Sequence, residues 1–393
     1  MLEYEDALSA VLRAARPLGV ERVRLEDSLG RFLAEDVAAD ADIPPFDRST
    51  VDGYACRRSD LRRELRVVAA VHAGEVPRRR IGRGECARIM TGAAVPPGAD
   101  CVVMLEEAVA SSGGRETVRV APGAATLNIL RRGSDLRRGQ RALRTGEPIR
   151  AAELAVLASV GCTRPLVGRK ARVGVISTGD ELIAPGSRPG THSTRVRDSN
   201  AVQLVAQAAR AGALARHHGI APDDPAAIRR AVRRALRTSD LVVLSGGVSV
   251  GERDLVPEVL RSCGFRILFD RVAMKPGKPV TFAVSDKALC LGLPGNPVSS
   301  FTAFEVLARP LLRRMMGCRR AEEALRMPLA KAVGRNRLLA LWVPVRIVRG
   351  RAEPVEYHGS AHSLALAAAD GLAAVPAGPG ALRKGAVVSV RPF

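Results

Sequence analysis

The sequence predicts a multi-domain protein in which a central α/β domain with a mostly parallel sheet lies between an inserted small β domain and a C-terminal small β domain. The chain has 393 residues, more than one hydrophobic core usually contains. Apolar segments alternate with helical patterns from about residue 170 to 315, as in parallel sheets whose strands are joined by helices. On either side, apolar segments are separated by glycine and proline turns, which is typical of small β domains.

Residues 3–16 have the pattern of an amphipathic helix. Leu8, Val11 and Leu12 recur at helical spacing, acidic residues occupy the first turn and arginines the last, and Pro17 ends the pattern. The chain begins with acidic residues, whereas a secretory signal begins with basic ones, so we do not expect export.

Glycine and proline turns dominate residues 40–140, where we predict a small β domain. They separate apolar segments at 65–71, 101–105 and 117–120, which we expect to be strands. A helical pattern returns over residues 151–160. Much later, after residue 320, apolar segments predict a last β domain; these segments are 343–348, 373–375 and 386–390.

The central region alternates strands with capped helices. A strand is expected over residues 172–177 and another over 241–244, whose unbroken apolar character is typical of a strand covered on both faces. Between them, residues 198–200 offer N-caps to a helix over 201–211. Residues 223–225 begin the next helix, with two aspartates as caps and a proline suited to the first helical position.

Composition argues against several classes of protein and site. The formal charge of +21 suggests nucleic-acid binding, but arginines run through every segment and aromatic residues, which stack on single strands, make up 3%. We therefore expect no nucleic-acid partner. No apolar run approaches the roughly 18–20 residues that a membrane span needs. The seven cysteines are scattered and never spaced as Cys-x-x-Cys, which predicts reduced thiols in a cytoplasmic protein, without disulfides or a zinc site.

Two rigid turns predict a site for a polyanionic small molecule. Residues 274–279 hold Lys275 and Lys278 at a set spacing between prolines and a glycine. Residues 292–300 lead into a helix whose N-terminus attracts anions. One such turn is equally well explained as an ordinary chain reversal, with lysines facing water. Two in series favour an anion site.

Three loops follow predicted strands of the α/β domain, at residues 177–181, 245–251 and 294–297. Their glycines let backbone N–H groups approach a phosphate, and their serines add hydroxyl donors. For one loop alone, a simple strand-to-helix turn explains the residues equally well. Three loops at the same edge of one sheet favour a nucleotide or phosphate ligand. None is a Walker A loop or a dinucleotide fingerprint. The candidate residues are Thr178, Gly179, Asp180, Ser245, Gly246, Gly247, Ser249, Pro294, Gly295, Asn296 and Pro297.

Acidic residues in or beside these loops suit Mg²⁺, which binds one or two carboxylates together with phosphate and water oxygens. The four acids are Asp180, Glu181, Asp198 and Asp254. Helix capping is the other explanation for Asp198 and Asp254. Asp52, Thr91 and Asp135 belong to the N-terminal β segment, and from the sequence alone each is equally well an ordinary turn residue.

In this order, the motifs resemble the molybdopterin molybdenumtransferase family, which also supplies the C-terminal part of gephyrin. The resemblance extends over nearly the whole chain, and its motifs are jointly specific. The matching segments are residues 45–47, 52–55, 90–93, 177–182, 198–200, 245–252, 275–279, 292–299 and 359–360.

The resemblance implies an enzyme of molybdenum cofactor biosynthesis that inserts molybdate into adenylylated molybdopterin, requires Mg²⁺ and releases AMP. It also implies an elongated homodimer of four-domain subunits. Each active site is then built from the α/β domain of one subunit and the β domain of the other. The implied domains are residues 1–19 with 171–322 (α/β, molybdopterin-binding), 20–38 with 140–170 (linking), 39–139 (β, completing the partner's site) and 323–393 (C-terminal β).

The resemblance assigns roles to particular residues. The implied catalytic residues are Asp52, Thr91, Asp135, Glu181 and Asp254, and Glu181 and Asp254 are the candidate Mg²⁺ ligands. To the loop residues above it adds the substrate-binding residues Asp198, Ser199, Asn200, Lys275, Lys278 and Ser360. Of these, the two lysines and Ser360 are expected to hold molybdate.

The sequence departs from the family pattern in several places. An arginine of the C-terminal domain that can help hold molybdate in the family has no clear match near residues 342–346, and the strongly basic composition is not a trait expected of the family. The family often has several arginines after Asn128 and Ile129, but Leu130 occupies the first of these places here. Arg131 or Arg132, which follow it, can compensate for the missing charge. Arg271 stands where a lysine can occur, which keeps the charge but not the geometry.

Two other functions stay open. A molybdopterin adenylyltransferase, which makes the adenylylated substrate and is also the candidate partner that delivers it, resembles the α/β domain alone. The segments with Asp52, Thr91 and Ser360 favour the insertase. A non-catalytic scaffold, the role that gephyrin adds in animals, has no motif in its support here. The resemblance does not distinguish molybdate from tungstate.

Overall fold

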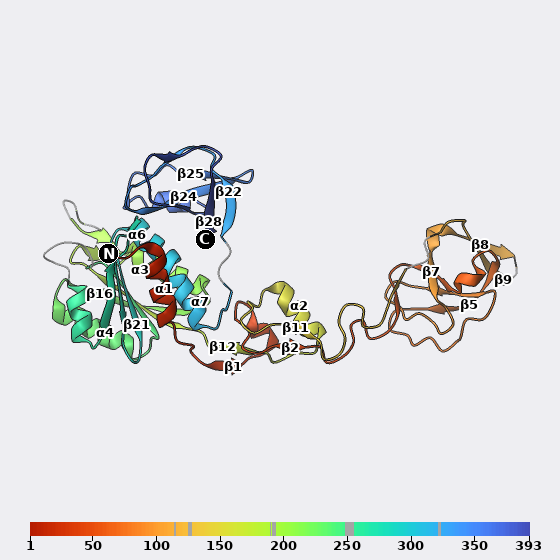
Figure 1. The fold of residues 1–393 in the computed structure, drawn as a ribbon. Helices are drawn as coiled ribbons and strands as arrows, with labels where there is room; N and C mark the ends of the chain where they lie inside the picture. Colours follow the sequence, from red (N-terminus) through yellow and green to blue (C-terminus); the bar gives the residue numbers. More distant parts are fainter. Residues whose placement is uncertain (114, 125–127, 189, 191–193, 248–254, 321–323) are drawn as a thin grey trace. The chain divides into compact units, whose positions relative to one another are not determined.

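The protein is described by a computed structural model that covers residues 1–113, 115–124, 128–188, 190, 194–247, 255–320 and 324–393. The chain divides into two compact units. The first comprises Met1–Glu35, Thr145–Arg150 and Arg164–Phe393, and the second comprises Asp36–Arg144 and Ala151–Thr163. Figure 1 labels the elements of both units. Within the described ranges, no helix combines the length and the apolar character needed to cross a bilayer.

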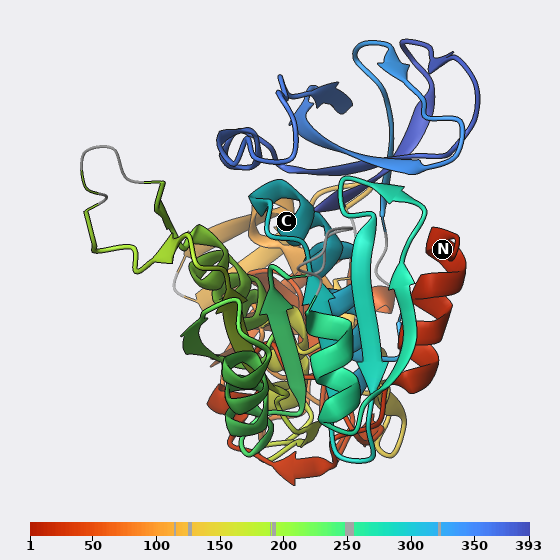
Figure 2. The same cartoon turned by 90° about the vertical axis from the view of Figure 1, so that its left-hand side faces the viewer.

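A six-stranded sheet forms the centre of the first unit, as Figures 1 and 2 show. The first four strands run parallel to one another, which confirms the predicted α/β domain, and the last two are antiparallel to their neighbours. Sequence analysis did not foresee this antiparallel edge, because apolar runs do not distinguish strand direction. In spatial order the strands are β16 (Leu214–Ala221), β13 (Arg172–Thr178), β17 (Leu241–Ser245), β21 (Leu289–Leu293), β20 (Pro279–Val284) and β18 (Arg266–Arg271).

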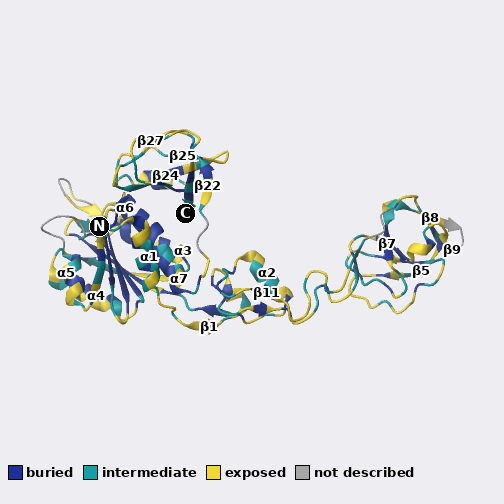
Figure 3. Ribbon diagram, in the orientation of Figure 1, coloured by how far each residue is buried: buried dark blue, intermediate teal, exposed yellow. Residues whose placement is uncertain are grey.

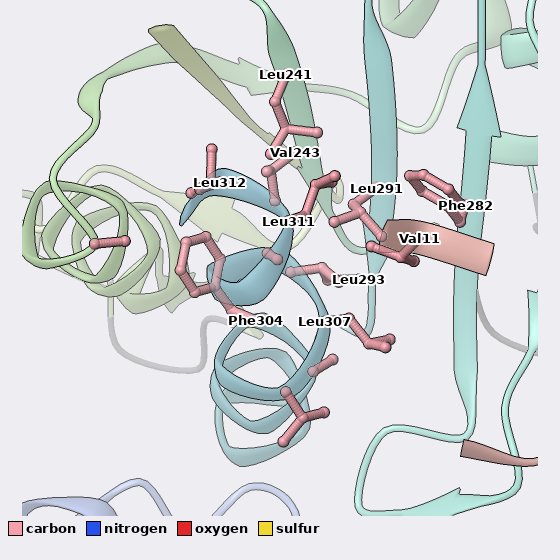
Figure 4. Packing of buried hydrophobic residues seen from close by; sticks show 14 of the residues in the cluster. Val11, Leu241, Val243, Phe282, Leu291, Leu293, Phe304, Leu307, Leu311 and Leu312 are labelled. Atoms are coloured by element: carbon pink, nitrogen blue, oxygen red, sulfur yellow. The ribbon is translucent and has the colours of Figure 1, made fainter. Parts of the chain in front are cut away.

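The inner strands of this sheet are buried on both faces, as the unbroken apolar run at residues 241–244 predicts. Leu241 and Val243 of β17 contribute to one hydrophobic cluster, whereas Val242 and Leu244 contribute to another on the opposite face. The first cluster packs helices α1 (Tyr4–Ala14), α3 (Ser199–Arg210), α6 (Pro297–Ala303) and α7 (Arg309–Met315), and the second packs α4 (Pro225–Leu236) and α5 (Val256–Ser262). Figure 3 shows the buried sheet, and Figure 4 shows Val243, Leu291 and Leu311 in the first cluster.

The predicted helix caps form. The Asp198 carboxylate accepts a hydrogen bond of 3.0 Å from the Ala201 amide at the start of α3. At the start of α4, the Asp224 carboxylate accepts one of 2.7 Å from the Ala227 amide. A buried π-helical turn, Phe304–Ala308, joins α6 to α7.

A second six-stranded sheet is formed mainly by the C-terminal segment. Strand β19 (Met274–Lys275) contributes its edge, so the turn with the two lysines is tied to this sheet. In order, its strands are β19, β24 (Ala340–Val348), β26 (Gly371–Val375), β28 (Val387–Pro392) and β22 (Leu325–Pro328), with β25 (Arg351–Pro354) paired to β24. Smaller elements of the unit are the pairs β1 (Val20–Arg22) with β12 (Leu166–Gly168), β14 (Leu182–Ile183) with β15 (Val196–Arg197) and β23 (Val333–Gly334) with β27 (Ala381–Leu382), the 3₁₀ turn Leu25–Ser28 and helix α8 (Leu364–Ala367).

The second unit contains the predicted β domain. Only glycine fits at position 53, because a Cβ atom there would overlap the carbonyl oxygen of Val103 on the neighbouring strand. The main sheet has the order β7 (Cys101–Met104), β4 (Gly53–Cys56), β6 (Glu85–Ile89), β5 (Glu64–Val71), β9 (Arg115–Val120) and β8 (Ala108–Gly113). Additional elements are the pairs β2 (Val37–Ala38) with β11 (Arg141–Leu143) and β3 (Arg48–Ser49) with β10 (Ile129–Leu130), helix α2 (Ala151–Ser159) and 3₁₀ turns at Arg58–Asp60 and Leu105–Glu107.

Candidate functional site

Three parallel strands of the central sheet end side by side. Ser177 near the end of β13 pairs with Ser245 of β17, and Ser245 pairs with Leu293 of β21. Because the strands are parallel, the loops that follow them leave the sheet at the same edge, where ligands of open α/β sheets bind. The structure therefore brings the three predicted loops together.

A cleft of about 1310 Å³ opens at this edge. It is lined by all three loops, by the start of α3, by the turn with the two lysines and by a loop of the C-terminal segment. The predicted site residues that line it are Thr178, Gly179, Glu181, Asp198, Ser199, Asn200, Ser245, Gly246, Gly247, Lys275, Lys278, Pro294, Gly295, Asn296, Pro297 and Ser360. The predicted residues Ser249 and Asp254 lie outside the described residues.

Gly246 allows two of the loops to approach each other. Its amide donates a hydrogen bond of 3.0 Å to the carbonyl oxygen of Leu293, at the end of the neighbouring strand. Its φ of 101° lies in a region that L-residues avoid, and a Cβ atom would overlap the carbonyl oxygen of Thr178. Glycine is therefore required here for packing between loops, whatever ligand the loops bind.

Lys275 and Lys278 are both exposed and line the cleft, whereas Pro276 and Gly277 between them are buried. Gly277 has a φ of 104°. The Lys278 carbonyl oxygen accepts a hydrogen bond of 2.9 Å from the Val272 amide, which closes the turn. Two ammonium groups are therefore attached to a well-held backbone, an arrangement suited to a small oxyanion.

The Ser360 loop is joined to the central domain. The Val298 amide, in the first turn of α6, donates a hydrogen bond of 3.0 Å to the Ser360 carbonyl oxygen. Tyr357 of the same loop also lines the cleft, and burial raises the pKa of its hydroxyl. The C-terminal segment thus contributes polar groups to the cleft.

The acidic residues of the cleft have different surroundings. Asp198 is buried; one carboxylate oxygen caps α3, and the other lies 3.7 Å from Nε2 of His217. Glu181 is exposed at the cleft. The predicted residue Asp180 is not among the residues that line the cleft, and its carboxylate instead accepts a hydrogen bond of 3.1 Å from the Asp223 amide. Asp180 therefore holds the loop that brings Asp223 to the cleft.

Sequence analysis did not single out several residues of the cleft lining, among them Asp223, Arg197, Leu339 and Tyr357. Asp223 was interpreted as a helix cap, but Asp224 caps α4 and leaves Asp223 at the cleft. Two adjacent aspartates before one helix were a signal, because one cap is enough and the second side chain is left for another role. Arg197 directly precedes the motif at residues 198–200, whereas Leu339 and Tyr357 lie outside the motifs. The fold brings all three residues to the cleft.

The remaining predicted residues belong to the second unit. Asp52 and Thr91 form a pair, because the Asp52 carboxylate accepts hydrogen bonds from the Thr91 amide (2.6 Å) and hydroxyl (2.8 Å). These bonds hold the pKa of Asp52 below its usual range, so the exposed carboxylate is ionised at neutral pH. Asp135 is exposed, and its amide donates to the Ile43 carbonyl oxygen at 3.0 Å.

One carboxylate at the cleft, that of Glu181, is a suitable ligand for magnesium. Mg²⁺ bound beside phosphates takes one or two carboxylates and completes its coordination with phosphate and water oxygens. Glu181 offers a hard carboxylate at the loop edge. Across the described part of the chain, no three His, Cys, Asp or Glu side chains are grouped so that they could hold a metal by themselves. The residues therefore fit an ion shared with a phosphate ligand.

The α/β domain that carries these loops and this cleft is of the molybdopterin-binding class, as a comparison with known families shows. A family described as "Probable molybdopterin binding domain" matches residues 174–314. "MoeA N-terminal region (domain I and II)" matches residues 2–161, and "MoeA C-terminal region (domain IV)" matches residues 326–393. The chain belongs to the molybdopterin molybdenumtransferase family.

Curated relatives and solved structures agree with this assignment. The molybdopterin molybdenumtransferase of Staphylococcus epidermidis is 32% identical over 404 aligned positions, covering 99% of this chain and 95% of that protein. That of Haemophilus influenzae is 36% identical over 346, covering 85% of this chain and 84% of the relative. A crystal structure of the molybdopterin biosynthesis moeA protein from Pyrococcus horikoshii matches with a TM-score of 0.77 at 32% identity, covering 100% and 99% of the two chains.

Proposed function

We propose that this chain inserts molybdate into adenylylated molybdopterin, with Mg²⁺, and releases AMP. Its relatives are transferases named for the transfer of molybdenum to molybdopterin, which supports the reaction class. The observation that carries the proposal is the cleft, where three glycine-rich loops and two exposed lysines converge. A pterin phosphate joined to AMP, together with molybdate, needs such a combination of phosphate donors and cations.

The loops bind the phosphoanhydride of the substrate in this proposal. The amides of Gly179 and Gly246 themselves donate to the carbonyl oxygens of Ala221 and Leu293, so other backbone N–H groups of the three loops bind the phosphates in this proposal. Ser245 and Asn200 hold the loops at their spacing through a hydrogen bond of 2.8 Å. Lys275 and Lys278 hold molybdate, and a hydroxyl from Ser360 completes its binding.

Glu181 and Asp254 are the proposed Mg²⁺ ligands, together with phosphate oxygens. Bound there, the ion would supply Lewis-acid stabilisation of charge on the phosphate that leaves with AMP. The remaining substrate-binding residues, Thr178, Asp180, Asp198, Ser199, Gly247, Ser249, Pro294, Asn296 and Pro297, shape the loops and orient the substrate.

We further propose a homodimer in the cytoplasm, in which Asp52, Thr91 and Asp135 of one subunit complete the site of its partner. We also propose the domain limits that the resemblance implies, with residues 39–139 as the contributing domain. The seven cysteines all lie in the described part of the chain and form no disulfide there, which supports a reducing compartment. A molybdopterin adenylyltransferase is the proposed source of the substrate, and no nucleic acid or membrane takes part.

The test is to mix purified protein with adenylylated molybdopterin, Mg²⁺ and molybdate, and to measure AMP. We expect AMP release that depends on both ions and that accompanies formation of the molybdenum cofactor. Formation of adenylylated molybdopterin from ATP and molybdopterin, without molybdate-dependent AMP release, would instead identify an adenylyltransferase.

A further inference from the structure

A two-stranded ribbon in the second unit places Arg48 opposite Leu130. Strands β3 and β10 are antiparallel, with Leu130 paired to Arg48 and Ile129 paired to Ser49. Ser49 is buried and Arg48 is half-buried, and the alternation of side chains along a strand places them on opposite faces. Directly opposed residues project from the same face, with Cβ atoms about 4.5–5.5 Å apart. A guanidinium attached at position 48 therefore reaches the surface that a side chain at position 130 would cover.

The backbone at Arg48 is held from both sides. On the edge away from β10, the Ser49 amide donates to the Ala93 carbonyl oxygen (2.9 Å), and the Gly92 amide donates to the Ser49 carbonyl oxygen (2.8 Å). These residues directly follow Thr91, the partner of Asp52. Arg48 thus belongs to the same hydrogen-bonded group of segments as the Asp52–Thr91 pair.

The two arginines that follow Leu130 are already paired. The Arg131 guanidinium donates to Asp47 at 2.6 Å, and that of Arg132 donates to Asp42 at 2.7 Å. Burial opposes ionisation of Asp47, but hydrogen bonds from the Arg132 amide and the Arg131 guanidinium outweigh it and hold the pKa of this carboxyl below its usual range. Among the described residues, in contrast, the Arg48 guanidinium has no hydrogen-bond or ion-pair partner.

We propose that Arg48 binds an anionic group of the substrate, a phosphate or an oxyanion, beside Asp52 and Thr91. It supplies from the neighbouring strand the positive charge that Leu130 does not provide. A planar guanidinium suits this role, because it offers paired donors to phosphate and oxyanion groups and stays charged at all physiological pH values. The inference deepens the proposed function and rests on it.

The experiment compares Arg48→Ala, the double variant Arg48→Ala with Leu130→Arg, and Arg78→Ala. Arg78 is an exposed arginine of the same unit, and its removal is the matched control for lost charge. We expect Arg48→Ala to lower kcat/KM for adenylylated molybdopterin roughly tenfold or more, as loss of a charge-assisted hydrogen bond does. The double variant should recover to within about threefold of wild type, and Arg78→Ala should match wild type.

Three results would overturn the inference: unchanged kcat/KM in Arg48→Ala, an equal loss in Arg78→Ala, or a loss that Leu130→Arg does not restore. Equilibrium binding of adenylylated molybdopterin to the same variants separates this inference from the proposed reaction. Wild-type protein that binds this molecule but releases no AMP would contradict the reaction. In that case, the affinities of Arg48→Ala, the double variant and Arg78→Ala for adenylylated molybdopterin, each compared with wild type, would still decide the role of Arg48.

Discussion

The Asn200 side-chain amide donates a hydrogen bond of 2.8 Å to the Ser245 hydroxyl, and so joins the start of α3 to the loop after β17. The same amide donates to the Gly295 carbonyl oxygen at 2.7 Å. One buried side chain therefore connects three segments that line the cleft. Such a connection sets the distance between phosphate donors, on which tight binding depends.

Replacing Asn200 by aspartate keeps the size of the side chain but removes both amide donors. We expect KM for adenylylated molybdopterin to rise about tenfold, and the free energy of unfolding to fall by about 1–3 kcal/mol, because the buried Ser245 hydroxyl and the Gly295 carbonyl oxygen lose their donor. Steady-state kinetics and urea unfolding measure the two effects. Val202→Ala, at an exposed position of α3, is the control. A wild-type KM in Asn200→Asp would show that the loops keep their spacing without this bond.

Replacing Lys275 or Lys278 by alanine should raise the molybdate concentration needed for half-maximal activity. Each charge-assisted bond contributes on the order of 1.5–3 kcal/mol, or roughly tenfold to hundredfold in affinity. Binding of adenylylated molybdopterin, measured by calorimetry, should change less. Lys287→Ala removes an exposed lysine from a turn of the same unit and serves as the control. The assignment is wrong if either cleft variant responds to molybdate as wild type does.

Asp52 and Glu181 should complement each other between subunits. A mixture of inactive Asp52→Asn and Glu181→Ala proteins should recover activity, up to about a quarter of the wild-type rate, because half of randomly formed dimers contain one intact site of two. Activity of the mixture is measured after subunit exchange, which differently tagged subunits demonstrate. Exchange without recovery would mean that both residues serve the site of their own subunit.

Glu181→Ala and Asp254→Asn test the magnesium proposal. Glu181→Ala should slow AMP release while leaving the protein folded, and Asp254→Asn should shift the Mg²⁺ dependence to higher concentration, because each removes a negatively charged carboxylate ligand. Titration of Mg²⁺ at saturating substrate measures the shift, and circular dichroism confirms the fold. Lost activity with an unchanged Mg²⁺ requirement in both variants would point to substrate positioning or proton transfer instead.

Asp240 at the start of β17 gives a prediction for stability. Burial opposes ionisation, but hydrogen bonds from the Arg169 guanidinium and the Arg172 amide outweigh it and lower the pKa of this carboxyl. Its stabilising contribution is therefore complete above the unfolded pKa of about 3.9 and is lost as pH falls through the lower folded value. Asp240→Asn should lower the free energy of unfolding by about 1–3 kcal/mol at pH 7. The difference from wild type should shrink below pH 4, and a difference that grows in acid would contradict this account.

Local features of the fold could be predicted because neighbouring residues decide them. The caps of α3 and α4 depend on side chains three positions from the amides they bind. The core strand β17 was recognisable because both of its faces are buried. In the same way, the loops that follow β13, β17 and β21 were found from glycine and serine next to apolar runs.

Other features depend on pairing between distant segments. The antiparallel direction of β18 and β20 has no signature in their composition, which suits either direction. Asp180 and Asp223 look alike in the sequence, yet the cleft is lined by Asp223, and Asp180 holds its amide. No local rule separates two such aspartates.

The sequence by itself showed the order of the motifs and the kind of ligand that the cleft suits. These could be read without the fold, because the backbone preferences of glycine and proline and the charge of lysine and acidic residues are properties of the residues themselves. Only the tertiary structure decided that Ser177, Ser245 and Leu293 lie in register at one edge, and that Arg48 faces Leu130 across a ribbon. The reason is physical. Strand register between distant segments is set by the burial of whole faces, since a shift of one residue would turn every side chain to the opposite side.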